Sequence, residues 1–276
     1  MRKNIFNYSK TFMVGMLMGI ANIIPGVSGG TIAVVTGVYD DLIESISQFL
    51  TASFIEKKKY SVFLFQIITG AGISIILLSK VIESAFKFYN YQILFFFIGL
   101  IIGSIPLLLN ENKIKLSISK KKKILSLLWF MIGLVIPILL IYLPESSYEK
   151  DGFLNLSVSG FIAAAAMILP GLSGSLMFLI LGTYKPIISA INNLDILIIS
   201  NVAIGGVIGL ITLSKIINYC IKNFVQYSYC FIIGLMLGSC VNIWPGIPMI
   251  SISFIFLLFI ISCIGVMIGI NLDKLK

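Results

Sequence analysis

Long apolar runs determine what this chain can fold into. A helix needs about 20 residues to cross a hydrocarbon core of about 30 Å, and apolar runs of that length occur at 61–80, 91–109, 124–143, 194–213, 228–245 and 249–270. Hydrophobic residues make up 58% of the 276 residues and charged residues 11%, whereas soluble domains carry roughly 25% charged residues. We therefore expect an all-α integral membrane protein with six spanning helices.

The chain also repeats itself. The segment "ANIIPGVSGGTIAVVTGVYDDLI" (21–43) matches "AMILPGLSGSLMFLILGTYKPII" (166–188) at an offset of 145 residues. Further on the offset falls to 135, where "LSKVI" (78–82) matches "LSKII" (213–217) and "IGLIIGS" (98–104) matches "IGLMLGS" (233–239). Three matches in the same order predict an internal duplication, with repeats over 1–143 and 144–276.

The distribution of positive charge predicts that the two repeats are inverted. Lysine and arginine in short loops mark the cytoplasmic side; here they cluster near both termini and at 57–59 and 113–123, while the acidic segment 144–152 is expected outside. These sides agree only if each PGxSG region is re-entrant, over 11–46 and 158–191, and dips in from its own face. Each repeat then has one re-entrant hairpin and three spans, with both termini in the cytoplasm. Two ordinary broken transmembrane helices are the alternative.

The PGxSG segments predict a break in a helix. Proline removes a backbone donor and glycine reaches conformations closed to other residues, so we expect Pro25-Gly26 and Pro170-Gly171 to end each first helix, the first near Ile24. Non-helical backbone is tolerated in a bilayer only where it is buried in protein or lines a wet cavity. Each new helix would then start in a cavity with free N–H groups, which attract anions.

A phosphate fits such a cavity, because hydroxyl donors stand beside glycines that allow close approach of the backbone. The expected phosphate-binding residues are Ser28, Gly29, Gly30 and Thr31 in the first repeat, and Ser173, Gly174 and Ser175 in the second. The alternative is that Ser28 and Ser173 only cap the two helices. Expected supporting residues are Asn22, Tyr39, Tyr184, Lys80 and Lys215, although snorkelling to the interface also explains the two lysines.

The segments "MGIANIIPGVSGGTIAVVTGVYDDLI" and "AAAMILPGLSGSLMFLILGTYKPII" resemble the two signature segments of the bacterial polyprenyl-phosphate transporter family. The resemblance covers essentially the whole chain. It implies a flippase of the bacterial inner membrane that returns undecaprenyl phosphate, the carrier lipid of cell-wall synthesis, from the outer to the inner leaflet. Asn22 and Lys185 depart from the family pattern, in which acidic residues are expected at these positions.

Other classes of function fit less well. The chain has no histidine and Arg2 is its only arginine, so phosphoryl transfer would lack a charge clamp and an acid or base; we expect no enzyme, and neither a metal nor another cofactor. The net charge of +9 lies in loops that orient membrane proteins, so the expected partners are polyprenyl phosphate and the bilayer, without nucleic acid. A transporter or channel for a small inorganic anion remains the alternative, and the sequence does not predict the oligomeric state.

Overall fold

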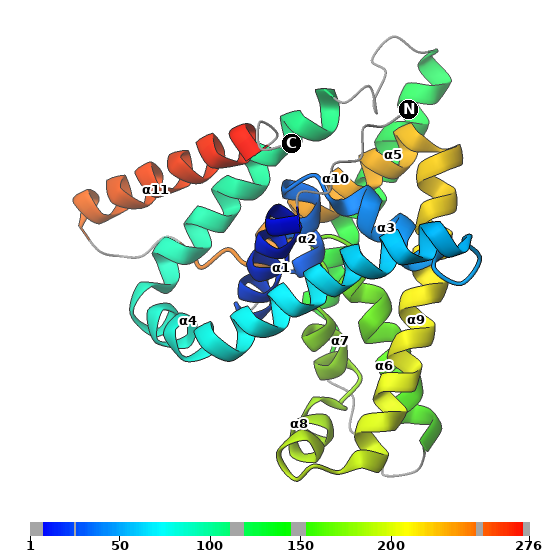
Figure 1. Ribbon diagram of the computed structural model, residues 1–276. Coiled ribbons are helices and arrows are strands. Elements are labelled where there is room, and N and C mark those ends of the chain that lie inside the picture. Colours follow the sequence, from blue (N-terminus) through cyan, green and yellow to red (C-terminus); the bar gives the residue numbers. More distant parts are fainter. Residues whose placement is uncertain (1–7, 25, 111–118, 145–152, 247–250, 273–276) are drawn as a thin grey trace.

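The fold is helical throughout the part of the chain that the computed structural model describes, residues 8–24, 26–110, 119–144, 153–246 and 251–272. Its helices are α1 (Tyr8–Ile23), α2 (Gly29–Val35), α3 (Tyr39–Gln48), α4 (Phe54–Asn110), α5 (Lys120–Ile141), α6 (Phe153–Ile168), α7 (Gly174–Ile180), α8 (Tyr184–Asn192), α9 (Ile196–Asn223), α10 (Val225–Asn242) and α11 (Ile252–Asn271) (Figure 1). The expectation of an all-α protein is confirmed.

Five of these helices, α4, α5, α9, α10 and α11, are long and apolar enough to cross a membrane. Helix α4 has 57 residues and contains two of the expected spans, 61–80 and 91–109. It bends at Tyr89, whose φ of −128° and ψ of 30° are not helical, and at about 1.5 Å per residue it is too long for one crossing. The short helices α7 and α8 meet at an angle of 117° and together form a further apolar pair. This is the organisation of a multi-pass membrane protein.

The two halves of the chain have the same local structure. Helices α1 and α6, α2 and α7, and α3 and α8 begin 145 residues apart. The bend at Tyr89 in α4 has its counterpart, 135 residues later, at Phe224 between α9 and α10, with φ of −128° and ψ of 44°. Gly26 and Gly171 have φ of 81° and 84°, in the left-handed region that favours glycine. The offsets of the sequence matches therefore recur in the backbone.

Glycines bring the long helices into close contact. Within the halves, α1 packs on α4 and α6 on α9; between them, α11 packs on α4 and α5 on α10 (Figure 1). A Cβ atom on Gly99 of α4 would lie 2.2 Å from the carbonyl oxygen of Ser262 in α11, and one on Gly234 of α10 would lie 2.2 Å from that of Phe130 in α5. Small residues let helices in lipid approach closely enough for van der Waals packing to hold them together.

Gly234→Ala is expected to destabilise the protein. The added methyl group would collide with the carbonyl oxygen of Phe130, and overpacking of this kind costs about 1–3 kcal/mol. The melting temperature of the purified protein in detergent measures the effect. Gly72→Ala is the matched control, because a Cβ atom there meets nothing within 4 Å. Equal melting temperatures for the two variants would contradict the packing account.

Candidate anion-binding site

Both PGxSG segments break a helix, as the sequence predicts. Helix α1 ends at Ile23 and α2 begins at Gly29; α6 ends at Ile168 and α7 begins at Gly174. Pro170 is fully buried in the second break, and Pro25 lies outside the described residues. The expected end of the first helix near Ile24 is confirmed. Each new helix is only 7 residues long and runs into a glycine turn, at Gly37 and Gly182, before the next helix.

The start of α2 is already occupied by contacts within the protein. The Gly30 N–H donates to the Ser28 hydroxyl at 3.1 Å, and the Gly29 N–H donates to the Asn22 side-chain oxygen at 2.9 Å. Ser28 and Thr31 are buried. The expectation that the N–H groups of Gly29 and Gly30 are free is therefore wrong, because buried donors take the nearest acceptors. Ser28 is a helix cap in this structure.

The start of α7 is more accessible. Ser173 makes no side-chain cap hydrogen bond; its hydroxyl instead pairs with that of Ser175 at 2.7 Å. Ser173 is half-buried and Ser175 is exposed. Gly174 is buried, and a Cβ atom there would lie 2.6 Å from the Met167 side chain. The second segment thus presents two hydroxyl groups at a position that a ligand can reach.

The two broken segments touch each other. The buried Gly171 N–H donates to the Thr31 hydroxyl oxygen at 2.9 Å, across a sequence separation of 140 residues. A Cβ atom on Gly30 would lie 3.0 Å from the carbonyl oxygens of Met167 and Ile168 at the end of α6. The structure therefore joins the start of α2 to the second break. Sequence reasoning missed this contact, since no local pattern records which residues of two repeats meet.

The expected supporting residues divide into two groups. Tyr39 is buried at the start of α3, where its hydroxyl has no hydrogen-bond partner among the described residues and its ring lines a cavity shared with Asp40 and Tyr229. The Tyr229 hydroxyl donates to the Asp40 carboxylate, a contact between the halves that the sequence did not indicate. Tyr184, the counterpart of Tyr39, is exposed.

Lys80 and Lys215 are not brought to the breaks. Both side chains are exposed, on α4 and α9. Neither makes a hydrogen bond or an ion pair within the described ranges. Snorkelling, the alternative explanation for these two lysines, is compatible with their exposure.

Thr31→Val is expected to lower the melting temperature. The substitution keeps the shape but removes the acceptor of the buried Gly171 N–H, and an unsatisfied buried donor costs about 1–3 kcal/mol. Thr36→Val is the control, because the Thr36 hydroxyl donates to carbonyl groups of its own helix. If both variants melt at the same temperature, the contact between the two breaks does not stabilise the fold.

Comparison with known proteins gives consistent matches over most of the chain. Residues 18–254 match a family described as undecaprenyl phosphate translocase-like. A protein of Vibrio cholerae serotype O1 named polyprenyl-phosphate transporter is 34% identical over 250 residues, which are 87% of this chain and 78% of that protein. A protein of Staphylococcus aureus with the same name is 32% identical over 275 residues, 95% of this chain and 94% of that protein. No solved structure matches the chain.

Proposed function

Because the chain belongs to the undecaprenyl phosphate translocase-like family, we propose that it transports polyprenyl phosphate across the bacterial inner membrane. The substrate is undecaprenyl phosphate, and the direction is from the outer to the inner leaflet, so that the carrier lipid is recycled for cell-wall synthesis. The names of both relatives support the substrate. The protein moves the lipid without chemical change.

The observation that carries this proposal is the meeting of the two helix breaks, through the Gly171 N–H and the Thr31 hydroxyl. Broken backbone is tolerated in a membrane where protein or a wet cavity satisfies it. The accessible hydroxyls of Ser173 and Ser175 lie in the same segment as Gly171 and can donate to phosphate oxygens. In this proposal the head group binds beside the second break while the polyprenyl tail stays in lipid.

The architecture proposed for transport is a pair of inverted repeats, 1–143 and 144–276, each with one re-entrant hairpin. Its support is the equal spacing of the helices in the two halves and their reciprocal packing, in which α11 packs on α4 and α5 on α10. Inverted repeats place substrates at their interface and expose the site to each side in turn by rocking. The lysine-rich loops put both termini in the cytoplasm.

Reconstitution into liposomes tests the proposal. The purified protein should move polyprenyl phosphate between leaflets and release no inorganic phosphate from it, since the sequence has no histidine and a single arginine. Accessibility of the head group to an added phosphatase reports the movement. If the liposomes instead take up inorganic phosphate or sulfate while the lipid stays in place, the protein is a transporter of small anions.

Replacing both Ser173 and Ser175 by alanine is expected to weaken lipid binding. A hydrogen bond to a charged group is worth about 1.5–3 kcal/mol, so loss of each hydroxyl lowers affinity roughly 10- to 100-fold. Titration of the purified protein with a short-chain polyprenyl phosphate measures the dissociation constant.

The matched control replaces Ser251 and Ser253, an exposed pair whose hydroxyls lie 2.8 Å apart at the start of α11. This second pair has the same spacing, geometry and position at a helix start, but it is not part of a PGxSG segment. Equal losses of affinity in the two double variants would remove the second break from the binding site.

A further inference from the structure

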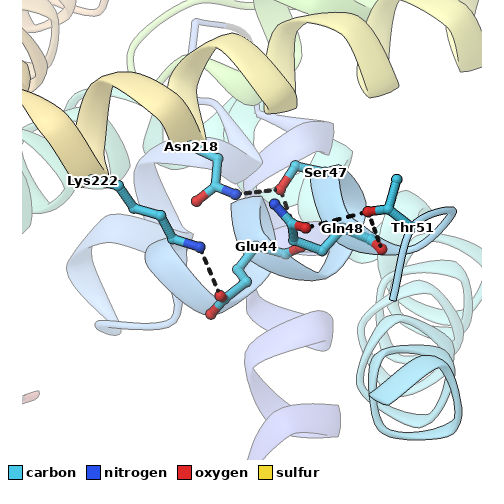
Figure 2. Close-up of polar contacts among 6 residues, drawn as sticks. All are labelled: Glu44, Ser47, Gln48, Thr51, Asn218 and Lys222. Atoms are coloured by element: carbon cyan, nitrogen blue, oxygen red, sulfur yellow. Dashed lines mark hydrogen bonds and ion pairs between the residues drawn. The ribbon is translucent and has the colours of Figure 1, made fainter. Parts of the chain in front are cut away.

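Three polar contacts hold one face of α3 against the second half of the chain. They are Asp40 with Tyr229, Glu44 with Lys222, and Ser47 with Asn218. The three α3 residues lie three or four positions apart and so share one helix face. The Lys222 ammonium lies 3.0 Å from the Glu44 carboxylate, and the Asn218 amide donates to the Ser47 hydroxyl at 2.8 Å, as Figure 2 shows. Helix α3 therefore bridges the two halves.

Helix α8, the counterpart of α3, makes no such bridge. Tyr39 and Ile43 of α3 are 3% and 1% exposed, whereas Tyr184 and Ile188 at the matching positions of α8 are 37% and 40% exposed. Helix α3 packs on α9, but α8 packs on its own neighbours α7 and α9. Within the described residues α8 has at most marginal contact with α4, which is the counterpart of α9. The symmetry of the sequence is thus broken in the packing.

The two helix breaks show the same asymmetry. Ser28 is 3% exposed and bonded as a cap, while Ser173 is half-buried and Ser175 is exposed. The exposed side of α8 also carries Lys185 and Ser189, and charged groups are costly against lipid. This side of α8 suits a watery opening or a protein partner better than a lipid surface. The structure is closed at α3 and open at α8.

A seat for α8 already exists on α4. At the offset of 135 residues, Lys87 and Glu83 are the counterparts of Lys222 and Asn218. Their side chains are 69% and 67% exposed and pair only with each other, at 3.1 Å, among the contacts of the described residues. They offer an ammonium and a carboxylate to Ser189 and Lys185 of α8, which are able to accept from the first and pair with the second.

We propose that α3 and α8 are alternating gates. In this structure α3 closes one face by its contacts with α9 and α10; when α3 releases, α8 docks on the Glu83–Lys87 segment of α4 and closes the other face. This inference rests on the proposed transport by inverted repeats, and it adds the residues that form each gate. The two docked contacts exclude each other, because the shared site must never open to both sides.

Cysteine cross-linking tests the gates in a background in which Cys220, Cys230, Cys240 and Cys263 are replaced. Ser47→Cys with Asn218→Cys reports the α3 gate, and Ser189→Cys with Lys87→Cys reports the α8 gate. Both pairs are expected to form disulfides in liposomes containing polyprenyl phosphate, and closing the first pair should prevent the second. Reduction of the first disulfide should restore it.

Ser189→Cys with Gly72→Cys is the control pair, since Gly72 lies on the same helix about 22 Å along the axis from Lys87. Cross-linking of this control as fast as the α8 pair would reveal random collision. Failure of the α8 pair to cross-link, or both gates cross-linked in one molecule, would overturn the inference.

A charge variant gives a second, independent readout. Lys222→Gln removes the ion pair of the α3 gate and is expected to raise the rate of α8 cross-linking about two- to five-fold, the range for a partly exposed pair. Lys58→Gln, an exposed lysine of α4 without an ion pair in the described ranges, should leave it unchanged. Equal rates in both variants count against the gate.

Failure of the gates and failure of the lipid-transport proposal are distinguishable. Cross-linking needs no assumption about the cargo, so the gates would stand if the liposomes carried inorganic phosphate. Lipid movement without exclusive cross-links would leave the transport function and remove the gates.

Discussion

One buried hydrogen bond, from the Gly171 N–H to the Thr31 hydroxyl, connects the two places where the chain gives up its helical backbone. Each break leaves polar groups that lipid cannot satisfy, so neither segment is stable alone in an apolar surrounding. Together they satisfy one another in part, and the caps of Asn22 and Ser28 complete the first. The second retains accessible hydroxyls, and the proposed phosphate site depends on that difference.

The glycine contacts keep these segments in register. Helix α11 packs on α4 through Gly99, and α5 packs on α10 through Gly234, so each half grips a long helix of the other. Such reciprocal packing allows the halves to rotate against each other without separating, because the contacts are backbone against backbone and need no fixed side-chain geometry. The polar contacts of α3 then decide which face is closed.

Local features of the fold were predictable from the sequence, and tertiary choices were not. Proline and glycine act on their own backbone, so the break after Ile23 and its copy after Ile168 follow from the motifs. The segment 81–90 has neither residue, and the helix there continues into the next span except at Tyr89. Ser28 and Ser173 stand in nearly identical local sequences yet differ in burial, because neighbours from distant helices decide their exposure.

The central claim is that the joined breaks bind the phosphate head group. Cryo-electron microscopy of the protein with a short-chain polyprenyl phosphate measures this directly. The account predicts density for the phosphate within hydrogen-bonding distance of the Ser173 and Ser175 hydroxyls, with the tail leading away into the detergent or lipid. Phosphate density at the lysine run 120–123, with the breaks empty, would contradict it.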